Sequence, residues 1–215
     1  MPTAQSNTSD FDAFLFEQIR ANNPSGLILD MDDTLYWESG FVIEFARQMR
    51  GKVLLEKGGL QADQFFNFFT ENWSRGNRKS IFQLSVLEFN LETVSASDFL
   101  ESMRSMSVPG GLALRHWARR TLTEMSIPIA ILTNGDPVLQ KNKFSQLSPE
   151  ELLRNVDLIC AKDYEAKPSA MGALKIIKNW GLAPDEVLLI GDSQVDLDCA
   201  KNAGCGFLWS VDFMP

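Results

Sequence analysis

Three carboxylates stand close together early in the chain, directly after a short apolar segment. Asp30, Asp32 and Asp33 follow residues 27–29, Leu-Ile-Leu. Like charges a few ångströms apart repel by roughly 1 to 4 kcal/mol at the dielectric of a protein surface. A divalent cation, or one carboxyl group that stays protonated, would relieve that repulsion. Mg2+ prefers oxygen ligands, often carboxylates together with substrate phosphate oxygens, so the cluster predicts a metal-assisted site that handles phosphate. The alternative for this stretch alone is a turn or helix N-cap without chemistry.

Polar residues also follow three later apolar segments. Thr133 and Asn134 come directly after the second segment, Lys167 lies in the loop after the third, and Asp192 follows the fourth, with Asp196 close behind. Strands of a parallel sheet bring such loops to one edge, where ligands bind. The alternative, that the polar residues only form turns or helix caps, would have to hold separately for each of the four loops. The set therefore favours one functional site.

The spacing of apolar residues predicts the elements that position this site. Short continuous apolar strands separated by helical patterns are typical of an α/β fold, here a Rossmann-like parallel sheet with helices on both faces. The expected strands are residues 27–29, 127–132, 156–160, 187–190 and 206–211. The expected helices of this part are residues 11–21, 112–125, 137–146, 149–155, 169–180 and 195–202.

The pattern of apolar residues in 37–108 differs from that in the rest of the chain. Apolar residues recur at helical spacing, as at Phe41, Phe45 and Met49, and no convincing strand is present. The segment reads as an inserted helical subdomain, and its aromatic residues are expected in its core. We therefore predict a Rossmann-like core of residues 1–36 and 109–215, and a helical cap of residues 37–108.

Composition narrows the class of protein. The 215 residues are 45% apolar and carry a formal net charge of −8, so neither nucleic acid nor an anionic membrane is an expected partner. The first ten residues lack the pattern of a signal peptide, and the three cysteines form no CxxC motif, which predicts reduced thiols in a cytoplasmic protein. The single histidine, His116, is interpreted as a half-buried structural residue. Nothing in the composition indicates the oligomeric state.

Phosphoryl transfer gives each of these groups a task. Asp30, at a strand tip, is placed to attack phosphorus and form an aspartyl-phosphate. Asp32 can serve as general acid and then as base for the hydrolytic water, with a pKa that we expect its neighbours to raise. Thr133 and backbone N–H groups around Asn134 can hold phosphoryl oxygens, and Lys167 offers a positive charge to those oxygens and to Asp30.

The remaining two acids complete the predicted metal site. Asp192 would join Asp30 in binding a hard cation, and Asp196 would bind it or orient the groups that do.

The four motifs together resemble those of the haloacid dehalogenase-like hydrolase superfamily. They read Asp-Met-Asp-Asp-Thr-Leu, Leu-Thr-Asn-Gly, Lys-Pro and Gly-Asp-Ser-Gln-Val-Asp, in that family's order. The resemblance implies Mg2+-dependent phosphatase chemistry, with Asp30 as nucleophile and Asp32 as acid and base. It also implies that the backbone carbonyl of Asp32 joins Asp30 and Asp192 on the metal, and that Thr133 and Lys167 bind phosphate.

The helical insertion is similar to the cap of the phosphoglycolate phosphatase, β-phosphoglucomutase and pyrimidine nucleotidase branch. True dehalogenases lack the second aspartate, so the presence of Asp32 argues against dehalogenation. Relatives usually carry Asp-Pro after the Lys-Pro pair, where this chain has Ser169 and Ala170.

The resulting prediction is a phosphatase that hydrolyses a small phosphorylated metabolite. A phosphomutase of the same superfamily is the nearest alternative, because it would use the same groups and return the phosphoryl group to a sugar. A phospho-accepting receiver module also uses acids, a Thr and a Lys on a parallel sheet. A catalytically silent scaffold is a further alternative, which the intact set of site residues disfavours.

Overall fold

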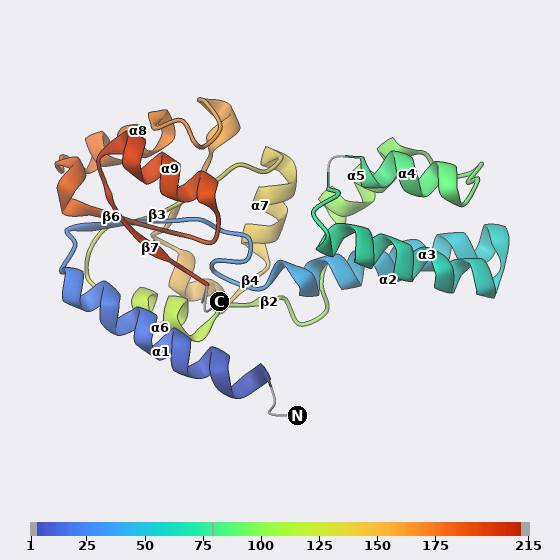
Figure 1. Ribbon diagram of the computed structural model, residues 1–215, viewed down its shortest axis with the longest axis horizontal. Helices are drawn as coiled ribbons and strands as arrows, with labels where there is room; N and C mark the ends of the chain where they lie inside the picture. The colour runs from blue at the N-terminus through green and yellow to red at the C-terminus, as the bar shows by residue number, and fades with distance from the viewer. Residues whose placement is uncertain (1–3, 79, 212–215) are drawn as a thin grey trace. The chain divides into compact units, whose positions relative to one another are not determined.

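The computed structural model describes residues 4–78 and 80–211, and it contains a five-stranded parallel sheet (Figure 1). The strand order is β5-β3-β1-β6-β7, so the first strand in the chain lies at the centre. Leu27 of β1 aligns with Ile129 of β3 and with Leu188 of β6. The bounds are β1 Gly26–Leu29, β3 Ile129–Thr133, β5 Asp157–Cys160, β6 Val187–Gly191 and β7 Gly206–Trp209.

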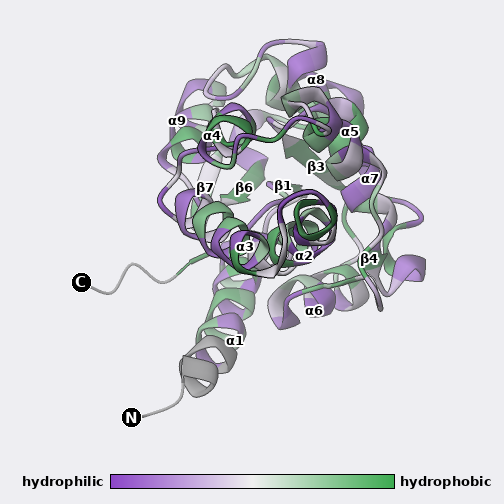
Figure 2. Ribbon diagram, turned by 90° about the vertical axis from the view of Figure 1, so that its right-hand side faces the viewer, coloured by the Kyte–Doolittle hydropathy of each residue, from purple (hydrophilic) through white to green (hydrophobic). Residues whose placement is uncertain are grey.

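Helices cover both faces of this sheet, which confirms the predicted α/β class. Figure 1 shows α8 (Met171–Trp180) and α9 (Gln194–Ala203) on one face, and α1 (Ala4–Asn22) and α6 (His116–Glu124) on the other. The helix α7 (Pro137–Ser145) follows β3. Side chains of the strands and of α8 and α9 share a buried apolar cluster, and the central strands carry the hydrophobic colour in Figure 2. Burial on both faces explains why β1, β3 and β6 are almost entirely apolar.

Two predicted helices are wrong in part. The predicted helix 112–125 begins only at His116, because Leu112–Ala113 form a short strand, β2, parallel to β4 (Leu147–Ser148). The predicted helix 149–155 is a 3-10 turn over Glu150–Leu153. The first difference arises where strand pairing outweighs a local helical pattern.

By contacts, the chain divides into two compact units, Met1–Trp37 with Gly111–Pro215, and Glu38–Gly110. The second unit contains α2 (Glu38–Lys57), α3 (Gly59–Ser74), α4 (Ile81–Glu88) and α5 (Ala96–Ser105). Its interior is aromatic: the rings of Phe45 and Phe69 lie 5.2 Å apart between centroids, and those of Phe65 and Phe99 lie 5.8 Å apart. All four side chains are buried, so this unit has a core of its own.

Within the described part of the chain, no helix combines the length and the apolar character needed to cross a membrane.

Candidate active site

The first acidic loop is anchored to the centre of the sheet. The backbone N–H of Asp30 donates to Ile190 O of β6 over 2.8 Å, and Leu35 N donates to Met31 O over 3.0 Å. Asp33 takes a left-handed conformation, with a φ of 56°, which Asp tolerates better than most residues. The buried guanidinium of Arg115 donates to the carbonyls of the loop, at 3.4 Å from the oxygen of Asp33. The loop is therefore fixed from both ends.

Lys167 lies between two of the predicted site acids. Its Nζ is 2.6 Å from Asp30 Oδ1 and 2.5 Å from Asp196 Oδ1, and its side chain is only 3% exposed. Burial alone would lower the pKa of Lys167, but attraction to the two carboxylates outweighs burial and raises it. Lys167 therefore carries its positive charge at any pH near neutrality.

Asn134 holds the backbone of the Lys167 loop. Its Nδ2 donates to Lys167 O over 2.9 Å, and its Oδ1 accepts from Lys167 N over 2.7 Å. The side chain of Asn134 thus positions the lysine, which leaves only its backbone for the phosphate contact that we predicted. We predicted that backbone N–H groups around Asn134 contact phosphate. The role of its side chain in positioning Lys167 was not predicted.

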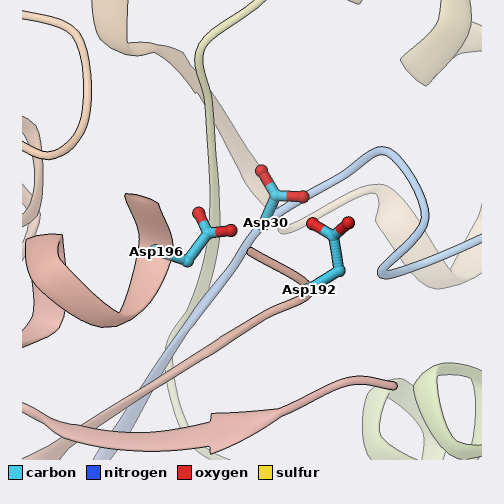
Figure 3. Close-up of side chains that lie close together, drawn as sticks. All are labelled: Asp30, Asp192 and Asp196. Atoms are coloured by element: carbon cyan, nitrogen blue, oxygen red, sulfur yellow. The ribbon is translucent and has the colours of Figure 1, made fainter. Parts of the chain in front are cut away.

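The structure brings Asp30, Asp192 and Asp196 together (Figure 3). One carboxylate oxygen from each lies within 4.8 Å of the others. Gly191 makes this approach possible, because a Cβ at that position would lie 2.5 Å from the Cβ of Asp196. Asp196 also accepts hydrogen bonds from the hydroxyl and the backbone N–H of Ser193, the latter over 3.2 Å. Asp196 is therefore committed to Lys167 and Ser193, whereas Asp30 and Asp192 have more acceptor capacity left.

Burial and mutual repulsion make these acids hard to ionise. Burial, partly opposed by Lys167 and reinforced by Asp196 and Asp192, raises the pKa of Asp30 to about 7. Burial and the neighbouring Asp196 raise the pKa of Asp192 to about 6. A single ammonium group thus does not neutralise the cluster, and an added cation would favour the ionised acids.

Asp32 has a separate environment, formed largely by α7. Lys143 Nζ lies 2.9 Å from Asp32 Oδ1, Gln140 Nε2 donates to Asp32 Oδ2 over 2.8 Å, and the hydroxyl of Tyr36 also donates to this carboxylate. Burial would raise the pKa of Asp32, but the charge of Lys143 and the three donors outweigh burial and lower it. The predicted rise in this pKa is therefore wrong, because the prediction considered only the neighbouring acids.

Gln140 also links Asp32 to the second motif. Its Nε2 donates to Thr133 Oγ1 over 2.6 Å, and both side chains are buried. Gly135 leaves room for this side chain, since a Cβ there would lie 2.3 Å from Gln140 Cδ. Sequence reasoning missed Gln140 and Lys143. The available signal was their spacing of three residues on a helix that begins directly after the Thr-Asn-Gly motif.

His116 and the cysteines lie outside these contacts. His116 is exposed at the start of α6, so the expectation that it is half-buried is wrong. All three cysteines are free. Burial raises the pKa of Cys160, and it raises the pKa of Cys199 and of Cys205 to about 11, which leaves these thiols protonated.

A sequence profile of the haloacid dehalogenase-like hydrolases matches residues 24–204. The chain belongs to this family. The match includes every predicted site residue from Asp30 to Asp196 and the whole helical unit between them. The polar cluster of this haloacid dehalogenase-like hydrolase therefore lies within the part of the chain that matches the family.

One relative of this hydrolase is a phosphoglycolate phosphatase from Chromobacterium violaceum, 33% identical over 86 residues. The matched segment covers 39% of this chain and 37% of the relative, so the match spans little more than a third of the relative's length.

Solved structures share the fold of this hydrolase. A putative β-phosphoglucomutase from Thermotoga maritima has a TM-score of 0.63 and 17% identity, with 88% of each chain covered. A putative phosphoglycolate phosphatase from Lactobacillus plantarum has a TM-score of 0.53 and 19% identity, covering 87% of this chain and 86% of that one. At these identities the likeness shows the fold alone.

Proposed function

We propose that this hydrolase is a Mg2+-dependent phosphomonoesterase that acts on a small phosphorylated metabolite through an aspartyl-phosphate. The observation that carries the proposal is the surrounding of Asp30, a buried carboxylate paired with Lys167 and adjacent to Asp192 and Asp196. Membership of a hydrolase family and the segment similar to a phosphoglycolate phosphatase support it. Three free cysteines fit a reducing, cytoplasmic setting.

The acidic cluster fits a hard divalent cation. Its donors are carboxylate oxygens, and burial together with the neighbouring acids raises the pKa values of Asp30 and Asp192, so a cation would favour their ionised forms. We assign the ligands to the carboxylates of Asp30 and Asp192 and, by the family resemblance, to the backbone carbonyl of Asp32. Asp196 then supports the site through Lys167. When bound, Mg2+ neutralises charge on the phosphoryl oxygens and on the nucleophile.

In the first step, Asp30 Oδ forms a bond to phosphorus while the bond between phosphorus and the ester oxygen breaks. Lys143 favours the ionised form of Asp32 in the free site, so Asp32 takes up a proton as the substrate binds. It gives this proton to the leaving oxygen, so that an alcohol and an ionised Asp32 result. In the second step Asp32 takes a proton from water, whose oxygen bonds to phosphorus. The bond between Asp30 and phosphorus breaks, which releases phosphate and restores both groups.

The other site residues hold the group that is transferred. Lys167 stabilises charge on the equatorial oxygens, and Thr133 offers a hydroxyl proton to them. Backbone N–H groups around Asn134 complete this contact, while the Asn134 side chain keeps Lys167 in place. The helical unit between the first and second motifs remains the proposed cap, with the choice of metabolite assigned to its residues.

The test is release of phosphate from a panel of phosphorylated sugars, nucleotides and small acids, and from p-nitrophenyl phosphate, with and without Mg2+. We expect Mg2+-dependent turnover that Asp30→Asn abolishes, and acid-quenched protein that carries one phosphoryl group on Asp30. Equal activity of the wild type and Asp30→Asn across the panel would refute the proposal.

Two alternatives appear as distinct outcomes of the same test. Transfer of the phosphoryl group to a sugar hydroxyl in preference to water would show a phosphomutase. A long-lived phosphoenzyme without turnover would show a receiver-like module.

A further inference from the structure

The face of α7 that carries Gln140 and Lys143 has no part in the roles assigned above. The two residues are one helical turn apart, and they are only 1% and 2% exposed. Helix α7 is well fixed at its start: Asp136 caps it by accepting from Leu139 N over 3.1 Å, and Pro137 occupies its first turn. Side chains on this face are therefore held by a defined helix.

Together the pair contacts both oxygens of Asp32. Lys143 donates to Oδ1 and Gln140 to Oδ2, at 2.9 and 2.8 Å, and Tyr36 adds a third donor from the loop. A carboxylate with donors from two elements has little freedom to rotate. Proton transfer requires hydrogen-bond distance to the reacting oxygen, so a fixed carboxylate favours transfer.

Gln140 orients Thr133 as well. Because Thr133 Oγ1 accepts from Gln140 Nε2, the threonine hydroxyl proton is left to donate elsewhere. The Oε1 atom of Gln140 is buried and accepts no hydrogen bond from any residue that the structure describes. An unpaired buried oxygen carries a desolvation cost. The hydrogen bonds that this amide does make are therefore those from Nε2 to Asp32 and to Thr133.

We propose that Gln140 and Lys143 are positioning residues that hold Asp32 for proton transfer, and that Gln140 also directs the hydroxyl of Thr133. This inference rests on the proposed phosphatase chemistry. Neither residue is assigned a contact with substrate. The effect of Lys143 is confined to the steps in which Asp32 moves a proton, whereas Gln140 also acts on the phosphoryl contact through Thr133.

The two chemical steps separate under a suitable choice of substrate. p-Nitrophenolate leaves without a proton, so phosphoenzyme formation from p-nitrophenyl phosphate does not need Asp32. Hydrolysis of the phosphoenzyme does need it, because water must lose a proton to a base. An alkyl phosphate needs Asp32 in both steps.

The experiment compares Gln140→Met and Lys143→Met with the wild type, all in Mg2+. With p-nitrophenyl phosphate we expect kcat and KM to fall together by about 10- to 100-fold, since general acid–base catalysis contributes about 100- to 10,000-fold in all. For Lys143→Met the ratio kcat/KM should stay within about threefold, because it reports only the steps through phosphoenzyme formation. For Gln140→Met this ratio should fall further, because Thr133 loses the donor that orients its hydroxyl. A burst of p-nitrophenolate equal to the enzyme concentration should precede the slow steady rate. With an alkyl phosphate, kcat/KM should fall by about the same 10- to 100-fold.

Two further variants control for packing and charge. Lys141→Met makes the same chemical change on an exposed position of α7, and it should behave as the wild type. Lys143→Arg keeps a cationic donor and should recover part of the lost kcat. An equal fall in kcat/KM for both substrates would show a merely structural role and overturn the inference. A burst of smaller amplitude with unchanged rate constants would do the same, because it would mean only that less of the protein is folded and active. Absence of turnover in the wild type would refute the proposed function itself.

Discussion

Binding of Mg2+ should release protons, in an amount that follows from the site acids. Asp30 has a pKa of about 7 and Asp192 of about 6, both raised first by burial. A cation binds the ionised carboxylates, so any proton on them must leave when it binds. The affinity for Mg2+ should therefore rise with pH across this range.

The two pKa values set the magnitude. At pH 7 Asp30 is about half protonated and Asp192 about one-tenth, which together amount to about 0.6 proton. The same arithmetic gives about 1.4 protons at pH 6 and about 0.1 at pH 8. Between pH 8 and pH 6 the affinity for Mg2+ should fall by about 20-fold, the product of the two protonation factors.

Titration calorimetry in buffers of different ionisation enthalpy measures this release directly. Asp192→Asn should bind Mg2+ more weakly and release fewer protons, because it lacks the contribution of Asp192. Asp185 is an exposed residue before β6, so Asp185→Asn should match the wild type. Mg2+ affinity that is unchanged between pH 6 and pH 8, with no proton release at either, would refute the reasoning about the acidic cluster.

Three further perturbations test other parts of the structure. Gly191→Ala should displace Asp196 and reduce turnover more than it reduces folding, which kinetics and circular dichroism would show; equal turnover would argue against the close approach. Phe69→Ala should lower the free energy of unfolding of the helical unit by about 3 to 5 kcal/mol in urea, and the exposed Leu87→Ala by less than about 0.5. Hydrogen bonds from the hydroxyl and backbone of a neighbouring loop lower the pKa of Glu56 to about 2, so its stabilisation should be complete above pH 4.5 and lost as the pH falls toward 2. Urea midpoints of Glu56→Gln and wild type should therefore converge at low pH, and a constant difference would contradict this.

The predictable part of the site consists of residues at strand ends. Asp30 and Asp192 directly follow apolar strands and Thr133 ends one, and parallel strands must bring those positions to one edge. Lys167 lies farther from its strand, and it was predicted from its place in the loop after that strand and from the Lys-Pro motif. These placements depend on topology and on short motifs, both of which are visible in one sequence.

The remaining part depends on side chains that meet only after folding. The pair Gln140 and Lys143 lies on a helix whose pattern looks ordinary, and only the structure turns its polar face toward Asp32. The direction of the pKa of Asp32 was predicted wrongly for the same reason. The neighbouring acids are adjacent in sequence, whereas the lysine that lowers the pKa of Asp32 is 111 residues away. Short strands such as β2 and β4 likewise exist through pairing that a local pattern does not encode.

Charge balance supports the proposal that a cation binds at the site before phosphate does. The site contains two buried ammonium groups and four carboxyl groups: Lys143, Lys167, Asp30, Asp32, Asp192 and Asp196. Lys143 and Asp32 form a pair that is separate from the other four groups. With all acids ionised, this set carries two negative charges in excess, and a phosphate dianion would add two more. Repulsion at such distances costs roughly 1 to 4 kcal/mol for each pair of charges. A dication restores neutrality in the free site and offsets half of the charge once the phosphoryl group is bound. Metal and phosphate should therefore bind with positive coupling, and each should raise the affinity for the other by the same factor.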